Sequence, residues 1–472
     1  MKGMQKPIKT IVSTAIAAII ASNAANAGSF SLYTEGSAAA QGNYAAGAAA
    51  EAADASTGWY NPAGLPLLHR QQGVFGLVVV DPTATLSGTS TFTSTGYPNY
   101  VQAFDGIEGG KVGYVPSLHY VLPLGDRMAF GLSMVSPFGL ATSWSPRGPV
   151  RYAATDSNLL TFDISPEIGG RVNEHFSVGL GIDFQYARVK FNSMLGSPAQ
   201  LQRITPFLLD SLSYNRGRSF GVGFHAGAMA LFNEEHTRVG LNYQSQLRHR
   251  FNGWSRLEGR LANLSPTVNL GTILSANPEA VFWSPTLASN TIILPAITTL
   301  SAYQDVNEKI ALLGSVVYTG WKSLQSIELD RVAAFAPTQG QLLVNSATAE
   351  NYRNAWRFSA GANYHVNDRV MLRVGGGYDQ TPTVDAFRDI RVPDANRWAA
   401  SIGAHYQPRP AIGVDIGYTH LFKAGDTRVN KTSVVGTGST YNVNADVNAH
   451  ADLFGIQAVW TIDQPAVLVA TK

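Results

Sequence analysis

One stretch of the chain, Gly217-Arg-Ser-Phe-Gly221, has the G-x-S-x-G spacing of a hydrolase nucleophile. That motif works at a turn from a strand into a helix, where the serine hydroxyl is held exposed. The alternation of the flanking residues predicts that this stretch enters a strand instead. The ten histidines show no metal-binding spacing such as H-E-x-x-H, and the chain has no cysteine. We therefore predict no catalytic residue, no metal site and no cofactor.

The composition favours a chain exposed to lipid. Charged residues make up 14% of the 472 residues and hydrophobic residues 45%, whereas soluble domains carry about 25% charged residues. The net charge of +2 gives no broad field for a polyanion, so we predict no nucleic-acid partner. Beyond residue 27 no run of roughly 18 apolar residues occurs, so only a closed barrel could cross a membrane.

Residues 1–27 have the features of a cleavable signal peptide. Three lysines precede an apolar run from Ile11 to Ile20, and Ala25-Asn26-Ala27 offers a small-x-small cleavage site. A membrane anchor is the alternative, but this run is short for a bilayer. We expect the segment to direct export and then to be removed.

Most of the remaining chain alternates between apolar and polar residues. Even positions from Phe176 to Tyr186 are apolar and odd positions are polar or small, and the pattern returns from Phe220 to Ala228 and from Trp398 to Tyr406. A period of two indicates strands. Soluble sandwiches also alternate, so this pattern alone leaves the architecture open.

The lengths of the connections favour a barrel. Six short polar turns, from Gly125-Asp126 to Pro408–Pro410, alternate with seven long connections, from residues 88–110 to 423–450. Outer-membrane barrels combine short periplasmic turns with long extracellular loops. We predict an all-β fold, a 14-stranded antiparallel transmembrane barrel over residues 73–461 with a C-terminal extension over 462–472. Its strands are predicted to start near Val74, Val112, Met128, Leu159, Phe176, Phe220, Val239, Thr298, Ile310, Trp356, Val370, Trp398, Ile412 and Leu453.

Residues 28–72 do not alternate and are rich in alanine and glycine. Since alanine is the best helix former, we expect a short helix at Ala45–Ala55, with breaks at Gly58 and at Asn61-Pro62. The lumen of a large barrel is often filled by a segment of the same chain. We predict that residues 28–72 form such a plug, with a flexible periplasmic tail as the alternative.

Several blocks resemble FadL-type transporters. Ser56-Thr-Gly-Trp-Tyr-Asn-Pro-Ala-Gly-Leu65 is similar to the N-terminal hatch of that family, whose hallmark is an Asn-Pro-Ala triplet. The resemblance covers nearly the whole mature chain and implies uptake of long-chain fatty acids or similar hydrophobic molecules across the outer membrane of a Gram-negative cell. We expect a monomer in outer-membrane lipid, inserted by the barrel assembly machinery. The further matching blocks are Ser136–Leu140, Arg151–Ala153, Trp356–Tyr364, Tyr378–Pro382, Ile390–Asp394 and Gly417–Phe422.

The connections at residues 192–217 and 252–295 are unusually apolar for segments that face water. Exposed apolar surface often marks a binding site, and the resemblance implies that these loops form a groove that captures ligand outside the cell. Packing of the loops against each other is the alternative. The predicted groove residues are Phe207, Leu208, Leu212, Trp254 and Leu257.

The resemblance also implies transfer from the groove to an interior pocket and release sideways beside a kinked third strand. We predict the lateral opening at Ser136, Pro137, Phe138 and Gly139, because Pro137 lacks the N–H for a ladder bond. The triplet Asn61, Pro62 and Ala63 is the predicted gate, with the Asn61 side chain bonded to the barrel wall near strand three. A turn that merely joins hatch and barrel is the alternative.

A buried carboxylate headgroup needs a cation or several donors, since an unpaired buried charge is costly. Arg151, which comes just before the fourth predicted strand, is our candidate, and surface pairing with Asp156 is the alternative. Two other functions remain open, a general diffusion porin and, less favoured, an outer-membrane hydrolase.

Overall fold

The computed structural model describes residues 30–203, 205–263, 275–336, 339–436 and 438–462. The predicted signal peptide and residues 463–472 of the predicted C-terminal extension lie outside these ranges. No helix in the described part of the chain is long and apolar enough to cross a membrane.

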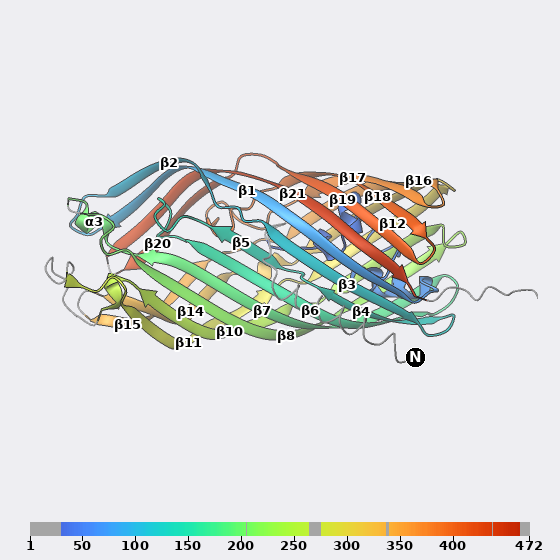
Figure 1. The fold of residues 1–472 in the computed structure, drawn as a ribbon, viewed down its shortest axis with the longest axis horizontal. Coiled ribbons are helices and arrows are strands. Elements are labelled where there is room, and N and C mark those ends of the chain that lie inside the picture. The colour runs from blue at the N-terminus through green and yellow to red at the C-terminus, as the bar shows by residue number, and fades with distance from the viewer. Residues whose placement is uncertain (1–29, 204, 264–274, 337–338, 437, 463–472) are drawn as a thin grey trace, which may run out of the picture.

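Fourteen strands of the described chain close into one antiparallel barrel (Figure 1). Strand β1 completes the ring because it pairs with β3 on one side and with β21 on the other. Every predicted strand start lies in or one residue from one of these strands, which confirms the predicted architecture. The barrel strands are β1 (Gln72–Ser94), β3 (Gly113–Pro123), β4 (Met128–Val135), β6 (Asp156–Arg171), β7 (Phe176–Leu195), β8 (Ser211–Phe232), β9 (Thr237–Gln244), β12 (Ile297–Asn307), β13 (Ile310–Thr319), β16 (Ala355–Asn367), β17 (Val370–Asp379), β18 (Arg397–Arg409), β19 (Ile412–Lys423) and β21 (Ser439–Thr461).

Seven further strands lie wholly or partly in connections that the sequence predicted as long loops. They extend the wall beyond one rim, as when β10 pairs with both β8 and β11. The prediction of plain loops was wrong there, because outside a membrane neither face of a strand has to be apolar and the period of two fades. Those strands are β2 (Tyr100–Glu108), β5 (Gly139–Ser143), β10 (Leu247–Glu258), β11 (Val281–Leu294), β14 (Ser326–Ala336), β15 (Gly340–Ala349) and β20 (Arg428–Gly436). Short helices in the same connections are α3 (Pro198–Leu201), η4 (Arg260–Ala262) and η5 (Trp321–Ser323).

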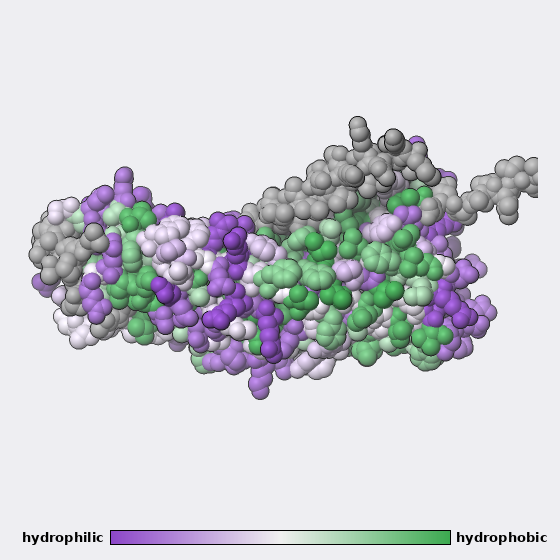
Figure 2. Space-filling view, turned by 90° about the horizontal axis from the view of Figure 1, so that it is seen from below, coloured by the Kyte–Doolittle hydropathy of each residue, from purple (hydrophilic) through white to green (hydrophobic). Residues whose placement is uncertain are grey.

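The alternation seen in the sequence separates the outside of the barrel from its inside. On β7, the apolar residues from Phe176 to Tyr186 are 40–50% exposed, whereas Asp183 and Gln185 between them are buried. The apolar face therefore points outward and forms a hydrophobic belt, which Figure 2 shows as the green area. A lipid bilayer requires such a belt on a spanning barrel.

The N-terminal segment, residues 30–67, is almost entirely buried and contains no helix at Ala45–Ala55. The helix prediction was wrong because the positive φ angles at Gly47 and Ala52 are incompatible with a continuous α-helix. Backbone amides here donate to side chains of the wall instead of to helical carbonyls. The Gly47 amide, for example, donates to Ser315 Oγ at 2.9 Å. Gly58 is no break either, since it lies within a helix, whereas the break at Asn61 is confirmed. The segment's short helices are η1 (Thr34–Gly36), η2 (Ala39–Gly42), α2 (Thr57–Tyr60) and η3 (Pro62–Leu67).

Polar groups of the segment meet inward-facing side chains from several sides of the barrel. Ser37 Oγ donates to Gln457 Oε1 of β21 at 3.1 Å. On another side, Ser177 Oγ of β7 donates to the Ala63 carbonyl at 2.7 Å. These contacts place the segment against the inner wall, where its ribbon is drawn in blue (Figure 1).

Candidate functional site

The five predicted groove residues are divided among four surroundings. Leu208 and Leu257 share an apolar cluster at the long-loop end, which we call the loop cluster. It comprises buried Leu201, Leu209, Leu257, Leu261, Ala262 and Ala333, with Leu195, Leu208, Ala280, Phe282 and Phe335 packed against it. Leu257 is fully buried, so the expectation that its apolar surface is exposed was wrong. Trp254 lies on the opposite, outward face of β10, and Leu212 on β8 is half-buried, outside the loop cluster.

Phe207 is the predicted groove residue with the most exposed side chain, at 45%. Its ring lies edge-on to Tyr100, with 6.2 Å between the ring centroids. The guanidinium carbon of Arg151 lies 4.4 Å from the centre of the Phe207 ring. The structure thus brings together an exposed aromatic ring and the predicted headgroup cation.

Arg151 is buried and held by several acceptors. Its Nε donates to Asp210 Oδ2 at 2.7 Å, and one terminal nitrogen donates to the Tyr152 hydroxyl at 2.7 Å. The alternative, that Arg151 pairs with Asp156, was wrong, because the Asp156 carboxylate pairs with Lys190 at 2.7 Å. Burial alone would lower the pKa of Arg151, but Tyr152 and Asp210 outweigh that effect and raise it. The residue is therefore a charged arginine inside a hydrogen-bonded loop network.

The predicted lateral opening coincides with an interruption in the hydrogen-bond ladder of the wall. Strands β3 and β4 pair up to Leu118↔Met134. The next contact toward the long loops is the isolated bridge Gly110↔Thr142. Residues 136–138, which include Pro137, form no strand and separate β4 from β5. We call this stretch of wall, residues 111–117 and 135–141, the window.

The start of the N-terminal segment lies against the window. The Leu32 amide donates to the Pro137 carbonyl at 2.8 Å, and the Gly139 amide donates to the Phe30 carbonyl at 2.8 Å. Phe138 itself is buried, and its amide donates to Thr161 Oγ1 at 2.9 Å. These bonds supply partners for backbone groups that the broken ladder leaves free.

Aromatic side chains gather behind the window. The Phe30 ring lies edge-on to Trp321 with centroids 4.5 Å apart, and Trp321 lies 5.9 Å from Phe138 and 5.7 Å from Tyr352. We call Phe30, Phe138, Trp321 and Tyr352 the aromatic cluster. The sequence analysis missed Phe30, Trp321 and Tyr352, because each stands alone in a polar or small-residue context and no local pattern joins them.

The gate triplet is buried, with Asn61 at its centre. The Asn61 side-chain amide donates to the Ala49 carbonyl at 2.7 Å and to the Ala228 carbonyl of β8 at 3.2 Å. Its carbonyl oxygen accepts from the Ala63 amide at 3.1 Å. The prediction that Asn61 contacts the wall is confirmed, but the contact is with the sixth strand of the barrel and not with the third.

Around the N-terminal segment the inside of the barrel is polar. Buried Arg373 pairs with Asp415, and buried Arg357 with Asp379. His225 Nδ1 lies 2.7 Å from Asp183 Oδ1. This part of the interior suits hydrogen bonding with the segment and does not suit an apolar ligand.

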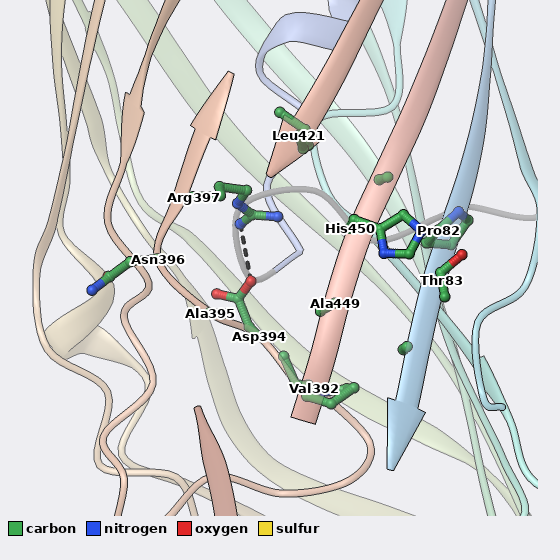
Figure 3. Close-up of a pocket in the computed structure, with 13 residues that line it drawn as sticks. Pro82, Thr83, Val392, Asp394, Ala395, Asn396, Arg397, Leu421, Ala449 and His450 are labelled. Carbon is green, nitrogen blue, oxygen red and sulfur yellow. Dashed lines mark ion pairs between the residues drawn. The ribbon is translucent and has the colours of Figure 1, made fainter. Parts of the chain in front are cut away.

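A separate pocket lies between β1, β19, β21 and residues 392–397 (Figure 3). Its wall combines apolar Val392 and Leu421 with an ion pair between Arg397 and Asp394, at 2.9 Å. None of the predicted site residues lines this pocket.

The described residues offer no cluster of three or more potential metal ligands. Gly217–Gly221 lies inside β8, so Ser219 is not at a strand-to-helix elbow.

Comparison with known proteins agrees with this architecture. A long-chain fatty acid transport protein of Salmonella typhi is 27% identical over 427 residues, covering 88% of this chain and 92% of that protein. Outer membrane protein P1 of Haemophilus influenzae is 28% identical over 486 residues, covering 96% and 99%. The crystal structure of a Pseudomonas aeruginosa FadL homologue matches with a TM-score of 0.75 and 24% identity, covering 90% of this chain and 98% of that one.

Another solved structure, the CymD monoaromatic hydrocarbon channel, matches with a TM-score of 0.62 and 18% identity, over 91% of this chain and 98% of that one. Both structural matches concern the fold. Residues 18–461 match the family described as outer membrane protein transport protein (OMPP1/FadL/TodX). Since that match spans nearly all of the barrel and the N-terminal segment, the chain belongs to this family of outer-membrane transport proteins.

Proposed function

We propose that the protein takes up long-chain fatty acids or similar hydrophobic molecules through the window in its wall. The observation that carries the proposal is the ladder interruption between Leu118↔Met134 and Gly110↔Thr142, with the aromatic cluster directly behind it. In an outer-membrane barrel the long-loop rim faces the outside of the cell, so the loop cluster is the first apolar surface that a ligand meets.

The chemistry of the interior favours a sideways exit. Each buried methylene contributes about 0.8 kcal/mol, so an acyl chain gains free energy only along a continuous apolar route. The loop cluster and the aromatic cluster provide such surfaces above the N-terminal segment. Farther along the barrel axis the chain would meet the Arg373–Asp415 pair and similar charges. Release through the window into the membrane avoids them.

We propose that the N-terminal segment is both the plug and the gate. It fills the polar part of the lumen through bonds such as that from Ser37 to Gln457. Its first residues, Phe30 to Leu32, cover the window from inside. Movement of these residues away from Pro137 would open the route, and Asn61 would hold the rest of the segment to β8 meanwhile.

Arg151 is the proposed partner of a carboxylate headgroup. It lies beside exposed Phe207, where a ligand entering from outside would pass. A fatty acid carboxylate would replace Asp210 at the guanidinium with a charge-assisted hydrogen bond of its own, and Asp210 would keep the hydrogen bond from the Tyr152 hydroxyl.

The direct test is uptake by cells that lack their own outer-membrane fatty acid transporter. Expression of this chain is expected to restore uptake of a labelled long-chain fatty acid without speeding entry of a small sugar. A general diffusion porin would admit the sugar. Equal stimulation of both solutes, or of neither, would exclude the proposed function.

A further inference from the structure

A dense group of cations lies on the outer wall just beyond the hydrophobic belt. It projects from the outward faces of three adjacent strands, β7, β8 and β10. We call it the basic patch; it consists of Arg188, Lys190, Arg216, Arg218, Arg248 and Arg250. Figure 2, which views the barrel from the side of β8 and β10, shows a strongly hydrophilic band where the green belt ends toward the long loops.

The patch lies at the depth of lipid headgroups. Outward-facing residues of β7 are apolar from Phe176 to Tyr186, and the next two outward positions are Arg188 and Lys190. Ten residue steps of a strand tilted by about 40° rise roughly 25 Å, which is about the height of the apolar band of such barrels. On β8 the same change occurs after Phe220, at Arg218 and Arg216.

Cations face one another within the patch. Arg188 stands directly opposite Arg218, and Lys190 directly opposite Arg216, in the β7–β8 pairing. Like charges in directly opposite positions destabilise a sheet. Lys190 pairs with Asp156 at 2.7 Å. Among the described residues, the five arginines of the patch have no acidic side chain within ion-pair distance, so a bound anion would offset the repulsion.

The charge just beyond the belt differs on another side of the barrel. At the corresponding level on the other side, just beyond the outward-facing Phe454, the paired residues are Asp81 and Asp452. A rim that attracted anions non-specifically would carry basic residues all round. Here one side is basic and another carries a pair of aspartates. The asymmetry indicates a localised site.

An aromatic ledge borders the patch on its long-loop side. Tyr214 stacks on Trp254 with ring centroids 5.0 Å apart, and Trp254 stacks on Trp283 at 4.6 Å. Tyrosine and tryptophan are favoured at membrane interfaces because one part of each side chain is apolar and the other polar. The ledge therefore marks the same headgroup layer, and it accounts for Trp254 better than a place in the ligand groove does.

We infer that the basic patch binds the phosphate groups of lipid A, the phosphorylated glycolipid of the outer leaflet. Arginine suits this role because its planar guanidinium donates two parallel hydrogen bonds to a phosphate. A disaccharide that carries phosphates at both ends could contact the β7–β8 and the β10 arginines together. The inference uses the outer-membrane location of the family and is independent of the ligand that the barrel transports.

The test compares lipid binding by two variants with the same loss of charge. The patch variant is Arg216→Gln with Arg218→Gln, Arg248→Gln and Arg250→Gln. The control variant changes four exposed cations on the short-turn rim, Arg127→Gln, Lys309→Gln, Arg369→Gln and Arg409→Gln. Each full-length protein is titrated in detergent with bisphosphorylated lipid A, phosphate-free lipid A and phosphatidylglycerol, and binding is followed by native mass spectrometry.

Wild type and the control variant are expected to bind bisphosphorylated lipid A about tenfold or more tightly than either other lipid, and the patch variant to lose that preference. Equal binding by the two variants would overturn the inference. So would equal binding of phosphatidylglycerol and lipid A by wild type, because the patch would then be a general anionic-lipid surface. If the patch variant is not heat-modifiable, and so not folded, Arg248→Gln with Arg250→Gln repeats the comparison against Arg127→Gln with Arg369→Gln.

Discussion

The side-chain amide of Asn61 donates a hydrogen bond to the backbone carbonyl of Ala228 in β8, at 3.2 Å. This bond joins the N-terminal segment to the middle of the barrel wall across 167 residues of sequence. The neighbouring Gly227 makes the approach possible, because a Cβ at that position would lie 1.9 Å from Asn61 Oδ1. This contact therefore depends both on the Asn61 side chain in the segment and on a glycine at position 227 in the wall.

We expect Asn61→Ala combined with Pro62→Ala to reduce fatty acid uptake several-fold while binding at the cell surface stays unchanged. The substitutions remove the hydrogen bonds of the Asn61 side chain to the Ala49 carbonyl, the Ala228 carbonyl and the Ala63 amide, each worth about 0.5–1.5 kcal/mol, and remove the fixed φ angle that begins η3. Uptake and surface binding of labelled fatty acid by whole cells would be measured separately.

Gly227→Ala should have the same effect from the wall side. Gly73→Ala is the matched control, since the nearest atom to its added Cβ lies 4.0 Å away. Normal uptake in both the Asn61–Pro62 and the Gly227 variants would refute the gate.

Deletion of residues 30–60 is expected to raise the single-channel ion conductance in a planar bilayer. The vacated part of the lumen would be lined by charged side chains such as Arg357, Arg373 and Asp415, which water and ions would solvate. Substitution of exposed Asp126 by Asn, in a short turn, serves as a control that leaves the lumen untouched. If conductance does not change after the deletion, the segment does not plug the barrel.

Phe207→Asp with Leu208→Asp is expected to weaken fatty acid binding by about tenfold or more, because an apolar contact of this size contributes about 1.5–3 kcal/mol. Val434→Asp is the control, since Val434 is 81% exposed on another extracellular strand. Equilibrium binding in detergent would be compared for the three proteins. Equal affinities would mean that these side chains only pack the loops.

The sequence was sufficient for the barrel because each spanning strand must be apolar toward lipid and is followed by a connection of characteristic length. It was insufficient where contacts join distant residues. Arg151 and Asp210 are 59 positions apart, so the nearer Asp156 was the partner that sequence alone suggested. The alanines near Ala45 favour a helix locally, but bonds to wall residues such as Ser315 override that preference.

Arg151→Ala is expected to reduce uptake of a fatty acid more than uptake of its methyl ester, because only the acid carries a charge for the guanidinium. The variant also leaves the largely buried Asp210 unpaired, which costs about 3–5 kcal/mol locally. Arg151→Ala with Asp210→Ala therefore separates the two effects, since it removes both charges. Were acid and ester impaired equally in both variants, Arg151 would have only a structural role.

The last prediction concerns pH and the contact between residues 380–396 and β20. Lys431 Nζ lies 3.0 Å from Asp389 Oδ2 and 4.0 Å from Glu350 Oε1. Burial raises the pKa of Glu350 to about 8. Burial would also raise that of Asp389, but Arg391 and Lys431 outweigh it and lower its pKa to about 2. The pKa values of the two carboxyl groups are therefore shifted in opposite directions.

The stabilising contribution of Asp389 is complete above its unfolded pKa of 3.8 and is lost as the pH falls through about 2. That of Glu350 is complete below its unfolded pKa of 4.5 and is lost as the pH rises through about 8. Between pH 5 and 8, of these two carboxyl groups only Glu350 changes its contribution to stability, so the contact should loosen as the pH rises. Hydrogen exchange of residues 380–396, corrected for the intrinsic rate, should therefore become faster over this range. Glu350→Gln should abolish that dependence, whereas Glu328→Gln, an exposed residue on β14, should retain it. A pH dependence of the same size in both variants would show that Glu350 does not control the contact.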